Sequence, residues 1–104
     1  MAKQYHKLVR DKIPAIITAG GGGCRVETLE QQAFIRALEE KLSEELAEYL
    51  ESRSLEELAD LQEVIRALVA ARGEGWEELE RLRLEKREKR GGFDRRLLLL
   101  EVTP

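Results

Sequence analysis

Four carboxylates stand out in this sequence because they form two pairs, each with its members three residues apart. Glu45 and Glu48 form the first pair, and Glu57 and Asp60 form the second. Residues three apart are neighbours on a helix surface, so each pair would present its oxygens from one helix. Carboxylates gathered away from water need a counter-charge because of desolvation and mutual repulsion. All-oxygen ligation suits Mg²⁺, or Mn²⁺, better than Zn²⁺.

The first pair falls on a helix expected over residues 29–51. At about 100° per residue, one apolar stripe of this helix consists of Leu38, Leu42 and Tyr49. Glu45 projects within about 20° of the edge of that stripe, and Glu48 lies about 60° further round. Glu44 points away from the stripe, and we expect water around it.

The second pair falls on a helix expected to start after Ser54 and to end near Gly73. Glu57 projects between apolar side chains of this helix, and Asp60 lies on a flank lined by alanines. Both pairs therefore turn toward the packed sides of their helices. Two interpretations stay open: the carboxylates bind a divalent cation, or Lys41 and nearby arginines neutralise them as ordinary ion pairs.

Helix start and stop signals predict a mainly α fold. Thr28 with Gln31, and Ser54 with Glu57, have the spacing of capping boxes. The short break at 52–54 predicts an antiparallel helix hairpin. A third helix is expected over Trp76 to about Arg90, followed by two glycines. The apolar tail, 93–102, predicts a short C-terminal strand that can pair with residues 25–27.

The composition limits the class of protein. The 104 residues suit one domain, 1–104, and 42% hydrophobic with 38% charged residues indicates a folded, charge-rich helical protein. A net charge of −3 and 5% aromatic residues argue against nucleic-acid binding. The single cysteine, Cys24, excludes an internal disulfide. Without an apolar signal segment or spanning run, we expect a cytoplasmic protein that does not enter a membrane.

The acidic motifs resemble those of a known family. The segment Glu44-Glu45-Leu46-Ala47-Glu48 followed by Glu57-Leu58-Ala59-Asp60 resembles the E-E-x-x-E and E-x-x-D signature of the MazG-like all-α nucleoside triphosphate pyrophosphohydrolases. This superfamily includes phosphoribosyl-ATP pyrophosphohydrolases and dimeric dUTPases. The flanking residues 5–17 and 90–93 resemble a small stand-alone branch of it, although the interval between the motifs is shorter than in several relatives.

The resemblance implies Mg²⁺-dependent hydrolysis of a nucleoside triphosphate to a monophosphate and pyrophosphate, in a house-cleaning role for the nucleotide pool. It implies that Glu45, Glu48, Glu57 and Asp60 are the catalytic metal ligands, with Glu44 at the first motif position. It also implies a homodimer or dimer of dimers in which paired hairpins form a four-helix bundle. The alternatives are hydrolysis of phosphoribosyl-ATP and a non-catalytic helical interaction module.

A triphosphate substrate would also need cations. Lys41 is the cation nearest to the first acidic pair on its helix. A basic stretch at the end of the third expected helix contains Arg83, Lys86, Arg87 and Arg90. The family likeness adds Lys7 and Arg10 near the N-terminus. The alternative for the basic stretch is a solvated helix end, where the helix dipole favours positive charge.

Overall fold

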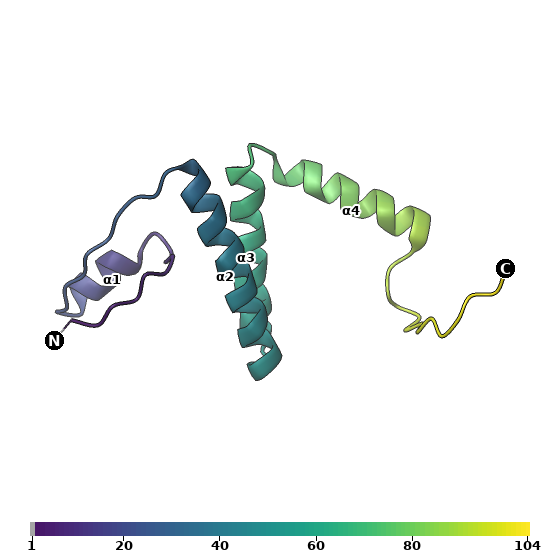
Figure 1. Cartoon of the computed structure of the whole chain (residues 1–104), viewed down its shortest axis with the longest axis horizontal. Helices are drawn as coiled ribbons and strands as arrows, with labels where there is room; N and C mark the ends of the chain where they lie inside the picture. The colour runs from purple at the N-terminus through teal and green to yellow at the C-terminus, as the bar shows by residue number, and fades with distance from the viewer. Residues whose placement is uncertain (1) are drawn as a thin grey trace.

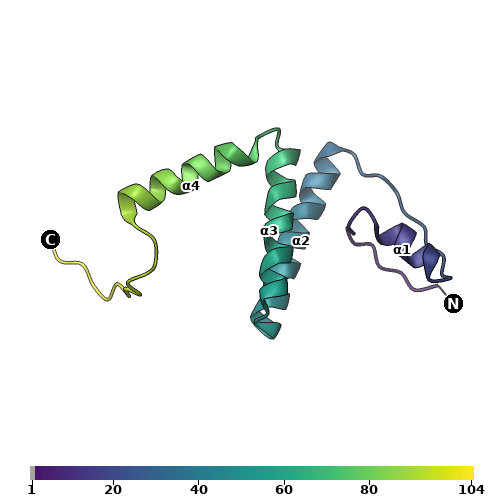
Figure 2. The ribbon, with the colours of Figure 1, turned by 180° about the vertical axis from the view of Figure 1, so that it is seen from behind.

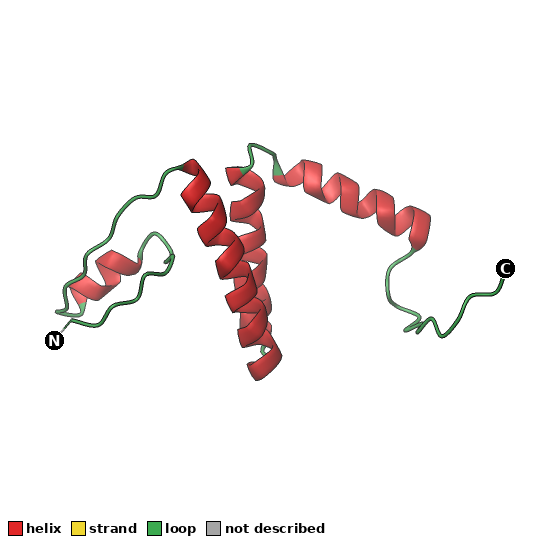
Figure 3. Ribbon diagram, viewed as in Figure 1, coloured by secondary structure: helices red, strands yellow, loops and turns green. Residues whose placement is uncertain are grey.

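A computed structural model describes residues 2–104, and these form helices joined by turns and irregular segments, without a strand (Figures 1 and 3). In chain order the helices are α1 (Ile13–Ala19), α2 (Gln31–Ser52), α3 (Leu55–Ala71) and α4 (Trp76–Arg90). The prediction of a mainly α fold is confirmed. The bounds of α4 agree with the expected helix, and those of α2 and α3 differ by one or two residues.

The centre of the structure is the antiparallel hairpin of α2 and α3, which the two views show side by side (Figures 1 and 2). The turn is short because Arg53 adopts a left-handed conformation, with φ 59°, and donates its backbone N–H to the Tyr49 carbonyl over 2.7 Å. The chain then enters α3 at Ser54, whose Oγ accepts the Glu57 backbone N–H over 3.3 Å. The Ser54 half of the predicted capping box is therefore confirmed, whereas the Ser54 backbone N–H donates to Ser52 Oγ and not to the Glu57 side chain.

The start of α2 differs from the prediction. Glu30, not Thr28, precedes the first helical residue, and no side chain caps the helix there. Gln31, the other half of the expected capping box, donates its side-chain amide to the Ala71 carbonyl at the end of α3. The side chain thus joins the open end of the hairpin instead of reaching back to the start of its own helix.

The hairpin encloses a small apolar core. Only Leu38, Val64 and Val69 are buried among the hydrophobic residues of the described chain. The radius of gyration is 18.5 Å, whereas a compact chain of about 100 residues has a value of about 13 Å. Several large apolar residues of the hairpin stay exposed, namely Leu46, Leu50, Leu55, Leu58 and Ile65. One chain alone therefore leaves much of its apolar surface in water.

The two ends of the chain extend from opposite sides of the hairpin (Figures 1 and 2). The helix α1 packs against neither hairpin helix and has no buried residue. On the other side α4 meets α3 near their junction, where the Arg66 guanidinium lies 4.4 Å from the centre of the Trp76 ring. Within residues 2–104, no helix combines the length and apolar character needed to cross a membrane.

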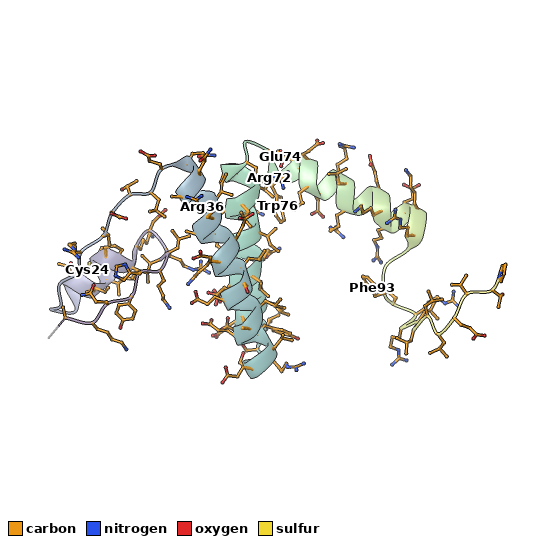
Figure 4. The ribbon with its side chains drawn as sticks, in the orientation of Figure 1. Cys24, Arg36, Arg72, Glu74, Trp76 and Phe93 are labelled. Atoms are coloured by element: carbon orange, nitrogen blue, oxygen red, sulfur yellow. The ribbon has the colours of Figure 1, made fainter. Side chains whose placement is uncertain are left out.

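The predicted C-terminal strand is wrong. Residues 93–102 form a turn and then an irregular extended segment, and Phe93 is 95% exposed (Figure 4). The helix α4 carries this segment away from the hairpin and from residues 25–27, so no strand edge lies beside it (Figure 1). An isolated extended segment has no partner for its backbone hydrogen bonds.

Candidate functional site

Glu45 is the centre of the candidate site. It is the only charged residue buried within the described chain, with 7% of its surface exposed. One carboxylate oxygen, Oε1, lies 3.4 Å from Lys41 Nζ, but Oε2 has no hydrogen-bond partner among residues 2–104. A buried oxygen without a partner destabilises the folded chain, and such an oxygen is a candidate ligand atom for a cation.

Two groups of carboxylates meet at Glu45. Glu44, Glu45 and Glu48 on α2 each place an oxygen within 4.8 Å of the others, and Glu45 does the same with Glu57 and Asp60 on α3. Glu45 therefore joins the second predicted pair across the hairpin, whereas Glu48 is exposed and is grouped only with Glu44 and Glu45 on α2. Neither His6 nor Cys24 belongs to these groups, so the donors are all oxygen, as Mg²⁺ and Mn²⁺ prefer.

The crowding of negative charge changes the acidity of two of these groups. The pKa of Glu57 is raised to about 7, mainly by desolvation and further by its hydrogen bond with Glu45 and the charge of Glu48. A hydrogen bond with Glu45 and the charge of Glu45 raise the pKa of Glu48. Like Glu45, Glu57 has a buried oxygen, Oε2, without a partner among the described residues. The cluster thus holds more negative charge than its surroundings neutralise.

Three cations lie at the edge of the cluster. Lys41 contacts Glu44 as well as Glu45, at 3.5 and 3.4 Å. From the N-terminal segment, Lys7 Nζ lies 3.3 Å from Glu44 Oε1. Arg10 donates to Asp60 Oδ1 over 2.6 Å. Lys7, Arg10 and Lys41 thus form the ion pairs that one interpretation of the sequence expected, and they place three positive charges at the edge of the cluster.

The expectation for Glu44 is wrong. Its side chain is only 34% exposed and is held by Lys7 and Lys41, instead of projecting into water. Partial burial works to raise the pKa of Glu44, but the Lys7 hydrogen bond and the charges of the two lysines outweigh it and lower that pKa. The angular argument considered α2 alone and could not include Lys7, which reaches Glu44 from the N-terminal segment. The spacing of Lys41 and Glu44, three residues apart, was the available signal.

The basic stretch on α4 does not reach the cluster in a single chain. Arg83 pairs with Glu80 one turn earlier, and Arg87 lies 3.2 Å from Asp94 beyond the end of the helix. Lys86 and Arg90 are exposed. Because α4 extends away from the hairpin (Figure 2), these four residues can approach a carboxylate cluster only on another copy of the chain or after a change in the direction of α4.

Comparison with known proteins adds no assignment: no protein-family model matches the chain, and no curated protein or solved structure shows significant similarity to it. The site therefore has to be interpreted from its own chemistry. Acidic oxygens from two helices, two of them buried without a partner among the described residues, can hold a divalent cation. The cations beside them can attract a polyanion such as a polyphosphate.

Proposed function

We propose that the protein is a Mg²⁺-dependent pyrophosphohydrolase that converts a nucleoside triphosphate to a monophosphate and pyrophosphate. The observation that carries this proposal is the buried, unpartnered oxygen of Glu45 at the meeting point of the two carboxylate groups. The resemblance of the two acidic motifs to MazG-like pyrophosphohydrolases supports it. Removal of unwanted nucleotides from the pool is the role that the resemblance suggests.

The residues present fit a divalent metal. Glu45, Glu48, Glu57 and Asp60 would hold Mg²⁺, or Mn²⁺, and Glu44 is close enough to assist. A bound Mg²⁺ lowers the pKa of coordinated water and offsets the charge of phosphoryl oxygens. The unpartnered oxygens of Glu45 and Glu57 would gain a ligand, which would remove the cost of their burial.

The chain's own residues have two tasks in this reaction. Lys41, Lys7 and Arg10 lie where they can bind and orient the phosphates. A carboxylate of the cluster accepts a proton from the attacking water. The new bond joins the water oxygen to phosphorus while the bond between the α- and β-phosphates breaks, and pyrophosphate leaves with the bridging oxygen.

The proposal includes a homodimer, alone or paired into a dimer of dimers. The exposed apolar residues of the hairpin and the large radius of gyration support it, because a second hairpin would cover this surface in a four-helix bundle. Such an assembly is also a route by which the basic residues of α4 come close to a carboxylate cluster. Light scattering should give twice or four times the mass of one chain, and a monomeric mass at micromolar concentration would contradict the dimer.

The direct test is a product analysis. The protein would be incubated with Mg²⁺ and a panel of ordinary and modified nucleoside triphosphates, and the products separated by anion exchange. Monophosphate and pyrophosphate should appear in equal amounts, without diphosphate. Reaction in ¹⁸O-labelled water should place the label in the monophosphate, and label in the pyrophosphate would contradict attack at the α-phosphorus.

Two variants control the assay. Glu57→Gln should abolish turnover because it removes a charged ligand with little change in shape. Glu63→Gln is the matched control, because Glu63 is exposed on the same helix and belongs to neither carboxylate group. Turnover of phosphoribosyl-ATP alone would change the substrate assignment. Failure to turn over any of these compounds, with Mg²⁺ bound, would favour a non-catalytic interaction module.

A further inference from the structure

The N-terminal segment crosses the rim of the carboxylate cluster and touches both helices of the hairpin. Lys7 pairs with Glu44 on α2, and Arg10 pairs with Asp60 on α3. These pairs join residues 37 and 50 positions apart in the chain. Within the described residues, these two hydrogen bonds are the ones that connect side chains of residues 2–10 to the hairpin. Leu8, between them, is the one residue of 2–10 that is half-buried.

We propose that Lys7 and Arg10 are positioning residues for the metal site: Arg10 holds the ligand Asp60 in place while the metal is bound, and Lys7 holds Glu44 beside the ligands. This inference rests on the metal site of the proposed function. It gives the N-terminal segment a role beyond contact with a substrate. Hydrogen bonds to ligating carboxylates orient them, and loss of such a partner typically lowers metal affinity about 10- to 100-fold.

The geometry at Asp60 supports the proposal. Arg10 donates to Oδ1, and Oδ2 has no ion pair or side-chain hydrogen bond within the described residues, so one oxygen can still bind a metal. The side chain of Arg10 is 59% exposed, so the remaining N–H groups of its guanidinium stay free on the outer side of the cluster. Arginine provides five donors in a fixed planar arrangement, which allows one guanidinium to hold a ligand and still meet a phosphate.

The charges of the cluster also favour retention of the segment when a metal binds. Five carboxylates, Glu44, Glu45, Glu48, Glu57 and Asp60, face three cations, Lys7, Arg10 and Lys41. With all of these groups ionised, the deficit is two positive charges, which is the charge of one divalent cation. Displacement of Lys7 and Arg10 by Mg²⁺ would leave the cluster with an excess of negative charge.

The test is calorimetric titration of Mg²⁺ into the full chain. Arg10→Gln should weaken Mg²⁺ binding about tenfold, and Lys7→Gln should weaken it in the same direction. Arg10→Lys, which keeps the charge but not the planar arrangement of donors, should recover part of the loss. Lys12→Gln is the control, because it removes the same charge from the same segment and Lys12 has no ion pair within the described residues. The Lys12→Gln variant should bind Mg²⁺ with the affinity of the wild type.

The direction of the change in Mg²⁺ affinity separates a positioning role from simple competition between these cations and Mg²⁺. Removal of a cation that merely neutralises the cluster would make Mg²⁺ bind more tightly, so equal or tighter binding by Arg10→Gln would overturn the proposal. In ¹⁵N spectra the guanidinium of Arg10 should remain restricted at saturating Mg²⁺, with exposed Arg95 as the mobile reference. Release of Arg10 on Mg²⁺ addition would also contradict it.

The outcomes distinguish this inference from the proposed activity. Mg²⁺ binding that depends on Arg10, in a protein that hydrolyses no nucleotide, would retain the positioning role and reject the enzyme. Turnover in which Arg10→Gln changes only the nucleotide KM, with Mg²⁺ affinity intact, would retain the enzyme and reject positioning. A wild-type protein that binds no Mg²⁺ would reject both. Unchanged helical circular dichroism in each variant would establish that the chain is folded.

Discussion

Replacement of Glu45 by glutamine should have opposite effects on stability with and without metal. Glu45→Gln keeps the shape of the side chain but removes a buried negative charge beside Glu48 and Glu57. The new amide group can donate a hydrogen bond to a neighbouring carboxylate. Without metal, we therefore expect the variant to be more stable than the wild type.

The magnitude follows from the contacts of the two oxygens. An unsatisfied buried group costs about 1–3 kcal/mol, and this cost is removed at Oε2. The ion pair of Oε1 with Lys41 is lost, at about 0.5 kcal/mol for a pair four residues apart on a helix. The net gain is about 0.5–2.5 kcal/mol. For a domain of about 100 residues, each kcal/mol raises Tm by about 4–8 °C.

At saturating Mg²⁺ the wild type should be more stable than Glu45→Gln, the reverse of the order without metal. A ligand at about 100 times its Kd stabilises the folded protein by about 2.7 kcal/mol, and this gain is available only to the wild type. Differential scanning calorimetry with EDTA and then with Mg²⁺, at one fixed protein concentration, measures both states. Glu39→Gln, at an exposed position on the same helix, should match the wild type in each condition. A Glu45→Gln protein that is less stable without metal, and gains as much from Mg²⁺ as the wild type, would refute the reasoning.

The other predictions concern acidity, capping and assembly. The pKa of Glu57 is about 7 in the folded protein and 4.5 ordinarily, so the folded chain binds a proton at Glu57 more tightly than the unfolded chain does. Without metal, the contribution of Glu57 to folding stability is therefore full below about pH 4.5 and is lost as the pH rises through about 7. Urea unfolding in EDTA should show this fall, and Glu57→Gln should reduce it; a stability that rises with pH would contradict the assignment. Ser54→Ala should cost about 1 kcal/mol, because the Glu57 N–H loses its cap, and an unchanged urea midpoint would argue against that hydrogen bond. Leu38→Ala should cost about 2–5 kcal/mol at any protein concentration. Leu46→Ala, at a position 48% exposed in one chain, should weaken the dimer in sedimentation, and no effect on mass or stability would place the interface elsewhere.

Local signals predicted the start of α3 and the end of α4 correctly because capping and glycine residues stand at these two ends. Ser54 and Gly91 mark ends that depend on a few neighbouring residues, and both were predicted correctly. The same local logic placed Glu45 near the packed side of α2, and Glu45 is buried. A helical period relates residues within one turn or two, so it is informative when the packing partner is the adjacent helix.

Features that depend on distant segments could not be predicted in this way. The burial of Glu44 depends on Lys7, and the start of α2 depends on a bond from Gln31 to the last residue of α3. The predicted strand failed for a related reason: the apolar character of residues 97–100 favours burial somewhere, but a strand also requires a neighbouring edge. The position of residues 93–102 depends on the direction of α4, which the neighbouring residues in the sequence do not determine.

The two-residue connection between α2 and α3 sets the alignment of the cluster although it provides no ligand. Glu48 precedes Arg53 by five positions, and Glu57 follows it by four, so the turn determines which levels of the two helices face each other. One residue inserted in this connection would advance α3 by about 1.5 Å and rotate it by about 100°, which would turn Glu57 and Asp60 away from Glu45. A change in the number of residues at the hairpin turn would therefore disturb the candidate site as directly as the loss of one of its carboxylates.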